Sequence, residues 1–192
     1  MGQLLQTKRI RVLSAWYSVF MSFSFAISAN AAIPPEKVRV SESKKTQNYL
    51  KDGVFTGGDQ AISRVSIKDI RRAPNSGFER IVIDLESFIE GEPVTLARAP
   101  YFQVAVSPEE RRLTVSIWGD PQLRFDPKKI SKNFQKSTWI SGIELLPKME
   151  TELWTFVLNL KNEASVEVFE LKDPSRIILD IKPSSPAHSA SK

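Results

Sequence analysis

Apolar and polar residues alternate in short runs between residues 62 and 182, and turn-forming residues separate the runs. Successive side chains of a β-strand point to opposite faces of its sheet, so this alternation is typical of strands with one buried face. The run 80–85, for example, places Ile81, Ile83 and Leu85 on one face. The pattern therefore predicts an all-β domain over residues 62–182.

This domain contains an internal repeat. The aligned pairs are 65–70 with 140–145 and 78–85 with 153–160 at an offset of 75 residues, and 102–117 with 166–181 at an offset of 64. The offsets differ because the first half carries an insertion within residues 87–100. Each half then supplies about four strands, too few to bury a core alone. We therefore predict a pseudo-symmetric two-sheet antiparallel sandwich built from a duplicated four-strand unit, with a closed barrel as the second possibility.

The strand phases agree between the halves and define a core and an outer face. The predicted core residues are Ile81, Ile83, Leu85, Leu113, Val115, Ile117, Phe156, Leu158, Leu160, Ile177, Leu179 and Ile181. The residues predicted to face solvent or a ligand are Arg80, Val82, Asp84, Arg112, Thr114, Ser116, Thr155, Val157, Asn159, Arg176, Ile178 and Asp180. The first strand of each half changes phase partway along, so we expect β-bulges near Lys68 and at Gly142.

Residues 126–134 predict one short crossover helix between the halves. Asp126 is a good N-cap, proline suits the first helical position, and Ile130 and Phe134 are one turn apart. Lys128, Lys132 and Lys136 would form a basic stripe if the helix extends. A solvated face is the default interpretation of this stripe, and contact with an anionic envelope polymer is the alternative.

Residues 1–31 have the three parts of a secretory signal peptide: three early cations, an uncharged run over 12–27, and an Ala-Asn-Ala site that predicts cleavage between Ala31 and Ala32. A membrane anchor is the alternative, although the run is shorter than the roughly 20 residues that span a bilayer. We expect a periplasmic protein without a membrane span after cleavage. Residues 32–61 are predicted to form a leader with a short strand near 38–40, and 183–192 a disordered tail.

Charge and composition exclude several function classes. Removal of the signal peptide lowers the formal net charge from +5 to +2, so no large basic field remains for nucleic acid. The chain has no cysteine, which excludes disulfides and thiolate metal sites. Its only histidine, His188, lies in the predicted tail, so neither a zinc site nor a Ser-His-Asp triad is expected. We therefore predict no enzyme, no catalytic residue, no metal and no cofactor, although a carboxylate pair for glycoside hydrolysis stays open.

The most distinctive outward positions are Arg80, Asp84, Arg176 and Asp180. They repeat one triplet in each half, an arginine, a β-branched residue and an aspartate at alternate positions. Aspartate is depleted in strands, so its recurrence beside arginine suggests a surface that is used. The alternative is cross-strand ion pairing that keeps an outer face soluble. Any such pairing must join two strands, because residues i and i+4 of one strand are about 13 Å apart.

Three further outward residues are candidate ligand contacts. Arg112 occupies the position equivalent to Arg176 in the repeat. Tyr101 and Trp118 could stack on sugar rings, although aromatic residues that cover a loop or a sheet edge are more common. Trp154 lies in the core phase and Trp139 precedes a strand, so both are expected to serve packing.

Residues 166–171 and 174–181 resemble the closing motif of the AMIN domain, the amidase N-terminal module, and 65–70 and 80–85 resemble its opening. The resemblance implies a two-sheet β fold in the periplasm that binds peptidoglycan through outer sheet faces, as in modules of cell-wall amidases and type IV pilus secretins. It also implies that the four Arg and Asp residues of the triplets match those of the motif. The chain departs from the pattern in its long first-half insertion and in Glu79, which precedes Arg80 where Pro174-Ser175 precede Arg176.

These observations favour a non-enzymatic module that binds peptidoglycan, alone or as a scaffold or targeting subunit of an envelope machine. The alternative is a protein-interaction domain of a pilus or secretion assembly, which would present a sheet edge or face to another envelope protein and have no affinity for glycan.

Overall fold

The computed structural model describes residues 34–89 and 92–184. The predicted signal peptide and its cleavage site, and residues 185–192 of the predicted tail, lie outside the described residues. In chain order the elements are a short 3-10 helix (Pro35–Lys37), β1 (Val38–Val40), β2 (Gly53–Gly57), β3 (Val65–Asn75), β4 (Phe78–Ile89), β5 (Glu92–Val94), β6 (Phe102–Ser107), β7 (Arg112–Trp118), β8 (Gln122–Leu123), α1 (Pro127–Phe134), β9 (Ile140–Leu145), β10 (Leu153–Leu160), β11 (Ala164–Leu171) and β12 (Arg176–Pro183).

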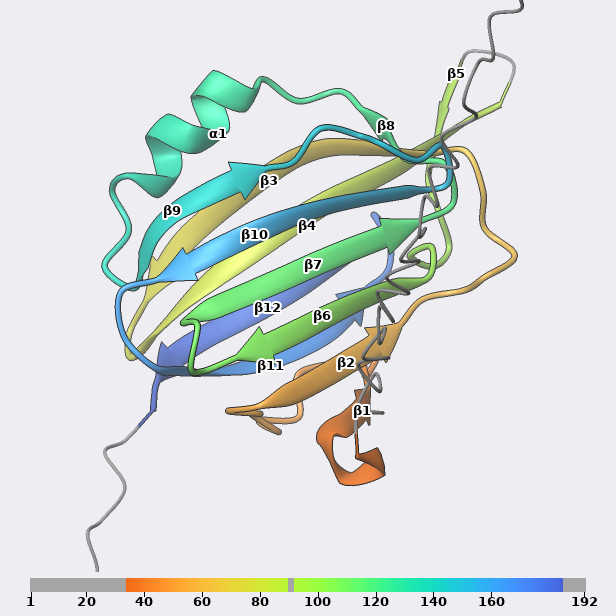
Figure 1. Cartoon of the computed structure of the whole chain (residues 1–192). Helices are drawn as coiled ribbons and strands as arrows, with labels where there is room; N and C mark the ends of the chain where they lie inside the picture. Colours follow the sequence, from red (N-terminus) through yellow and green to blue (C-terminus); the bar gives the residue numbers. More distant parts are fainter. Residues whose placement is uncertain (1–33, 90–91, 185–192) are drawn as a thin grey trace, which may run out of the picture. The chain divides into compact units, whose positions relative to one another are not determined.

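The strands form two sheets that face each other across one apolar core (Figure 1). The first sheet has the order β1-β2-β6-β7-β10-β9, and the second has the order β11-β12-β4-β3-β8 with β5 beside β4. Two short strands pair in parallel with a neighbour: β1 with β2, and β8 with β3. All other described strand pairs are antiparallel. The predicted two-sheet sandwich is therefore confirmed.

The predicted repeat is visible in the topology. Strands β3, β4, β6 and β7 of the first half correspond to β9, β10, β11 and β12 of the second. Each sheet joins one hairpin from each half, β6-β7 with β10-β9 in the first sheet and β11-β12 with β4-β3 in the second. Because both halves contribute to both sheets, neither half can close the core without the other.

The predicted core and bulges are also confirmed. All twelve predicted core residues are buried, and none is more than 6% exposed. The pairing of β3 with β4 shifts register between Ile67 and Asp69, next to Lys68. The pairing of β9 with β10 shifts where Gly142 pairs with Asn159 but Ile140 pairs with Leu160, which leaves Ser141 as the extra residue. Both bulges keep the apolar residues before and after them on the core side.

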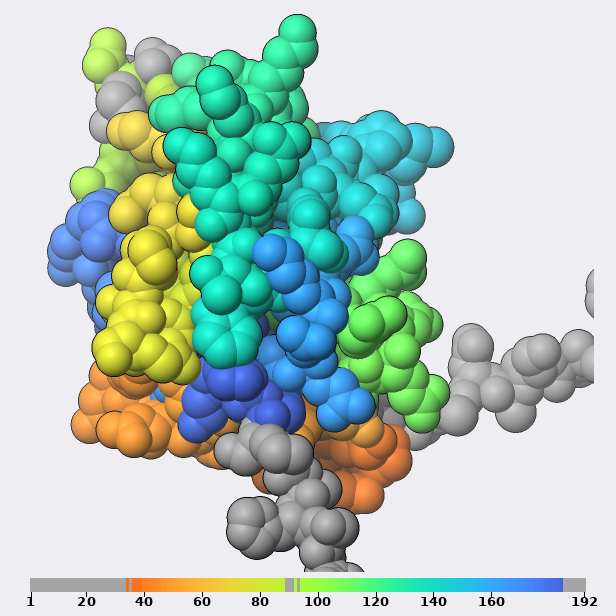
Figure 2. All heavy atoms as spheres, turned by 90° about the vertical axis from the view of Figure 1, so that its left-hand side faces the viewer, coloured from red at the N-terminus to blue at the C-terminus, as the bar shows by residue number. Residues whose placement is uncertain are grey.

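Helix α1 closes one open side of the sandwich. Asp126 caps it by accepting hydrogen bonds from the backbone N–H groups of Lys128 and Lys129, at 2.9 and 3.4 Å. Ile130 and Phe134 are buried in the core. The helix packs against β9 of the first sheet and β3 of the second, and Figure 2 shows it between the strands of the two halves. None of the helices within the described residues has the length and apolar character needed to cross a bilayer.

Part of the predicted leader belongs to the sandwich. The short strand expected near 38–40 is present as β1, and β2 adds the buried residues Val54 and Phe55 to the first sheet. Residues 41–50, here called the strap, run beside the edge strand β11. Leu50 and Val166 exchange two backbone hydrogen bonds of 2.8 Å, and Glu170 donates its N–H to the carbonyl of Glu42. The strap thus covers the edge strand β11, whereas α1 packs on β9 and β3.

Candidate functional site

The four Arg and Asp residues of the repeated triplets meet as two ion pairs across the seam between β4 and β12. Arg80 lies opposite Asp180, and Arg176 lies opposite Asp84. Arg80 donates to Asp180 through Nε and Nη2 at 2.7 and 2.8 Å, and Arg176 donates to Asp84 through Nε at 3.0 Å. Sequence reasoning required pairing between strands, and the antiparallel register supplies it.

The carboxylate of the Arg80–Asp180 pair is closed to solvent, although the side chain of Arg80 is 30% exposed. Asp180 is 0% exposed and also accepts a 2.6 Å bond from Lys45 of the strap. The rings of Phe78 and Phe169 flank the Arg80 guanidinium at 5.6 and 5.4 Å. The hydrogen bond to Asp180 raises the pKa of Arg80. Burial lowers the pKa of Lys45, but its bond and attraction to Asp180 outweigh burial and raise the pKa overall. This half of the triplet surface therefore serves the fold.

Two further buried carboxylates of β11 fasten the strap. Glu167 accepts backbone N–H bonds from Thr46 and Gln47, both at 2.6 Å. Glu170 accepts from the Ser41 hydroxyl at 3.0 Å and from the Gly58 N–H at 2.9 Å. Charge-assisted bonds to backbone donors are stronger than neutral ones, so polar contacts hold the strap in addition to the packing of Leu50 against the core.

The prediction that all outward residues face solvent or a ligand is wrong for four positions. Asp180 is buried beneath Lys45 and Arg80, and Val82 and Ile178 pack with Phe169 in a small second apolar cluster. On the first sheet, Val157 is buried as well. The alternation gave the correct side of each strand, but it carried no information on what covers that side.

The Arg176–Asp84 pair stays open to solvent. Asp84 also accepts from Arg71 of β3, through Nε at 2.6 Å and Nη2 at 3.1 Å. The side chains of Arg71, Arg176 and Asp84 are 46%, 31% and 18% exposed. Hydrogen bonding to Asp84 raises the pKa of Arg71. Of the two carboxylates, Asp84 is therefore the one that a ligand can reach.

Asp84 and Arg176 line a hollow of about 580 Å³, here called the charged groove. Its walls are the bulge of β3, the middle of β4, the end of β5, the segment that leads into α1 with the first turns of the helix, and the turn and first residue of β12. The full lining is Lys68, Asp69, Asp84, Leu85, Glu86, Val94, Thr95, Arg124, Phe125, Asp126, Lys129, Pro174 and Arg176.

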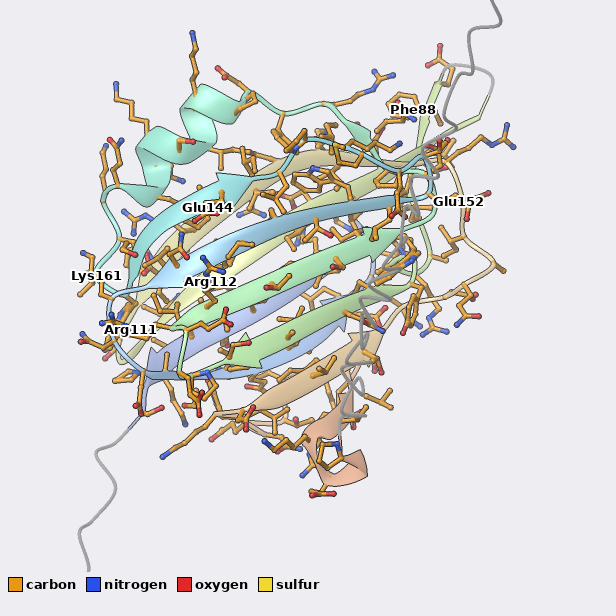
Figure 3. The ribbon with its side chains drawn as sticks, viewed as in Figure 1. Phe88, Arg111, Arg112, Glu144, Glu152 and Lys161 are labelled. Carbon is orange, nitrogen blue, oxygen red and sulfur yellow. The ribbon has the colours of Figure 1, made fainter. Side chains whose placement is uncertain are left out.

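Each carboxylate of the charged groove accepts a hydrogen bond within the protein, whereas two of its cations form no ion pair among the described residues. Asp84 binds two arginines, Glu86 binds Lys68, Asp126 caps α1, and Asp69 accepts the N–H of Ile70. Within the described residues, neither Arg124 nor Lys129 forms an ion pair. The Arg124 guanidinium lies 4.0 Å from the ring of Phe88, which Figure 3 labels at this end of the sandwich. The groove can therefore accept an anionic group.

The remaining candidates lie apart from this groove. Tyr101 and Trp118 contact each other, with ring centroids 5.0 Å apart, and line a second hollow on the first sheet. Arg112 is exposed, pairs weakly with Glu110 at 3.4 Å, and lies at the opposite end of the first sheet from Glu152 (Figure 3). Trp154 is buried in the core, as expected.

Sequence reasoning missed Lys45, Arg71, Arg124 and Lys129. The outward phase of Arg71 on a strand next to β4 is a signal that could have found it. The other three lie in the strap, in a loop and on the helix, where no strand phase applies. Within residues 34–89 and 92–184, no cluster of three or more carboxylate or imidazole groups is placed to hold a metal ion.

In comparisons with known proteins, no protein-family model and no curated protein matches this chain.

Proposed function

We propose that this chain is a non-enzymatic periplasmic module that binds peptidoglycan in the charged groove. The observation that carries the proposal is a difference in hydrogen bonding within the groove: each carboxylate accepts a hydrogen bond from the protein, whereas Arg124 and Lys129 form no ion pair among the described residues. The stem peptides of peptidoglycan present carboxylates and amides. Arginine and lysine bind carboxylates through charge-assisted hydrogen bonds, and Thr95 offers a neutral partner for an amide.

The resemblance to the AMIN domain supports the same proposal. The residues that carry it, 65–70, 80–85, 166–171 and 174–181, lie in β3, β4, β11 and β12 and at the end of the turn before β12. Asp84 and Arg176 come from these strands and reach the groove. The two-sheet fold that the resemblance implies is the fold of this chain. We assign Asp84 a positioning role rather than a catalytic one, because two guanidinium groups occupy its carboxylate.

The protein-interaction alternative is favoured by one observation. The loop between β9 and β10 exposes Leu146 and Met149, the latter at 86%, and these residues line a shallow hollow with Pro147 and Leu153. Exposed apolar side chains gathered in one place are typical of protein contacts. If this loop is the working surface, the chain serves an envelope assembly without affinity for glycan.

The test is co-sedimentation of the purified protein with isolated sacculi at low salt. We expect the wild type to pellet, and the double variant Arg124→Ala/Lys129→Ala to bind about tenfold more weakly, because it loses two charge-assisted contacts. The matched control, Lys132→Ala/Lys136→Ala, removes the same charge from exposed positions outside the groove and should pellet like the wild type.

Two results would contradict the proposal. A folded wild type that stays in the supernatant has no affinity for the wall. Equal weakening by the two double variants would mean that the protein binds through its overall charge rather than through the groove.

A further inference from the structure

A second hollow, here called the aromatic hollow, lies on the first sheet and measures about 370 Å³. Trp118 is the last residue of β7 and Tyr101 comes directly before β6, so the sheet places both rings at one end. The rings meet at an angle of 51° and both remain partly exposed. The polar residues of the rim are Gln60, Ser63, Asp120 and Glu152.

The Tyr101 ring and the backbone that carries both rings are held in place before any ligand arrives. The backbone N–H of Trp118 donates to the carbonyl of Tyr101 at 2.9 Å, and Gln103 donates to the Tyr101 hydroxyl at 2.7 Å. Gly119 has a φ of +88°, and a Cβ there would lie 2.5 Å from the carbonyl oxygen of Ile62. This turn positions Asp120, which Lys148 holds by an ion pair of 2.7 Å. A rigid site loses less conformational entropy when it binds.

The aromatic pair is not a requirement of the duplicated fold. At the repeat offset of 64 residues, Tyr101 and Trp118 correspond to Ser165 and Lys182 in the second half. Ser165 is buried, and the ammonium group of Lys182 lies 3.6 Å from the centre of the Tyr49 ring. The same strand ends therefore fold without aromatic residues, so packing alone does not explain why two partly exposed rings stand here.

We propose that the aromatic hollow binds a pyranose ring of the wall glycan. A pyranose has an apolar face of C–H groups, which packs on aromatic rings, and an equatorial rim of hydroxyls, which bond to carboxylates and amides. Lys148 neutralises Asp120, but Glu152 forms no ion pair among the described residues, so its carboxylate favours a neutral sugar over an anionic peptide. The hollow thus complements the charged groove, and the inference rests on the proposed function because it takes the wall as the source of the glycan.

The two sites lie at the same end of the sandwich. Residues 119–126 pass directly from the aromatic hollow, which Asp120 lines, to the charged groove, which Arg124 lines. Figure 3 shows Glu152 of the hollow and Phe88, beside Arg124, at this end. In this proposal, a wall fragment binds here with its sugar in the hollow and its peptide in the groove.

The test is a calorimetric titration of the purified protein with the peptide-free tetramer of β-1,4-linked N-acetylglucosamine. We expect the wild type to bind and Trp118→Ala to bind about tenfold more weakly, since it loses the stacking face. Trp118→Phe keeps an aromatic face and should retain most of the affinity. The matched control Trp139→Ala removes a tryptophan at the opposite end of the first sheet and should bind like the wild type.

The inference is overturned if the wild type does not bind the tetramer, or if Trp118→Ala binds it as tightly as the wild type does. Parallel co-sedimentation with sacculi separates this failure from failure of the proposed function. A wild type that pellets with sacculi but ignores the tetramer overturns the sugar site alone. A wild type that binds the tetramer but stays in the supernatant when sacculi pellet supports the sugar site and contradicts wall binding through the charged groove.

Discussion

Replacing Arg80 with methionine is expected to lower the free energy of unfolding by about 3 kcal/mol, because it leaves the carboxylate of Asp180 buried with only Lys45 as its charged partner. Methionine keeps most of the apolar stem, so the loss reports the missing guanidinium. Equilibrium unfolding in urea measures the difference between variant and wild type.

The control is Arg176→Met in the open pair. There Asp84 keeps Arg71 and contact with water, so we expect a loss of about 1 kcal/mol or less. Equal losses in the two variants would contradict the division of the seam into a closed structural pair and an open pair. Once folded, the Arg80 variant should still pellet with sacculi, because its pair lies outside the charged groove.

Replacing Phe134 with alanine is expected to lower the free energy of unfolding by about 3–5 kcal/mol. Phe134 is 0% exposed and belongs to the central core, so the truncation leaves a cavity between α1 and the sandwich. Urea unfolding monitored by circular dichroism checks the value. Lys132→Ala on the exposed side of the same helix should change stability by less than about 0.5 kcal/mol. A Phe134 variant as stable as this control would contradict the claim that Phe134 anchors α1 in the core.

Local patterns were sufficient for most of the fold. The alternate spacing of Ile177, Leu179 and Ile181 predicts their strand. Asp126 predicts the start of the helix because it is a good N-cap, and the phase change near Lys68 predicts the bulge. The strap has no such pattern, because its residues are polar and its position depends on distant carboxylates. Glu167, which binds Thr46, lies 121 residues away in the sequence. Contacts of that separation leave no periodic signal in the strap itself.

The candidate site was predictable only in part, for the same reason. The repeat indicated that Arg80, Asp84, Arg176 and Asp180 belong to one surface, and the register joins them in two pairs. The strap decides which pair is closed, so the sequence alone could not separate them. Arg124 and Lys129 are candidate ligand contacts because the carboxylates of the groove accept hydrogen bonds from other residues. This difference depends on where the side chains lie, so the sequence does not reveal it.

The duplicated halves have diverged on their outer faces. The positions equivalent to Arg80 and Asp180 in the first sheet are Thr155 and Ser116, whose hydroxyls lie 3.0 Å apart. The position equivalent to Asp84 is Asn159, opposite Arg112. The second sheet therefore has the charged seam and groove, and the first has the aromatic hollow. The two sheets therefore share a strand arrangement but present different side chains on their outer faces.

Backbone hydrogen exchange of the purified protein, with and without soluble peptidoglycan fragments that carry stem peptides, tests wall binding in the charged groove most directly. We predict slower exchange of the amides of residues 84–86 and 124–129 in the presence of the fragments, and unchanged exchange in the strap. Protection confined to the loop between β9 and β10, or no protection at any residue of the groove, would contradict the account.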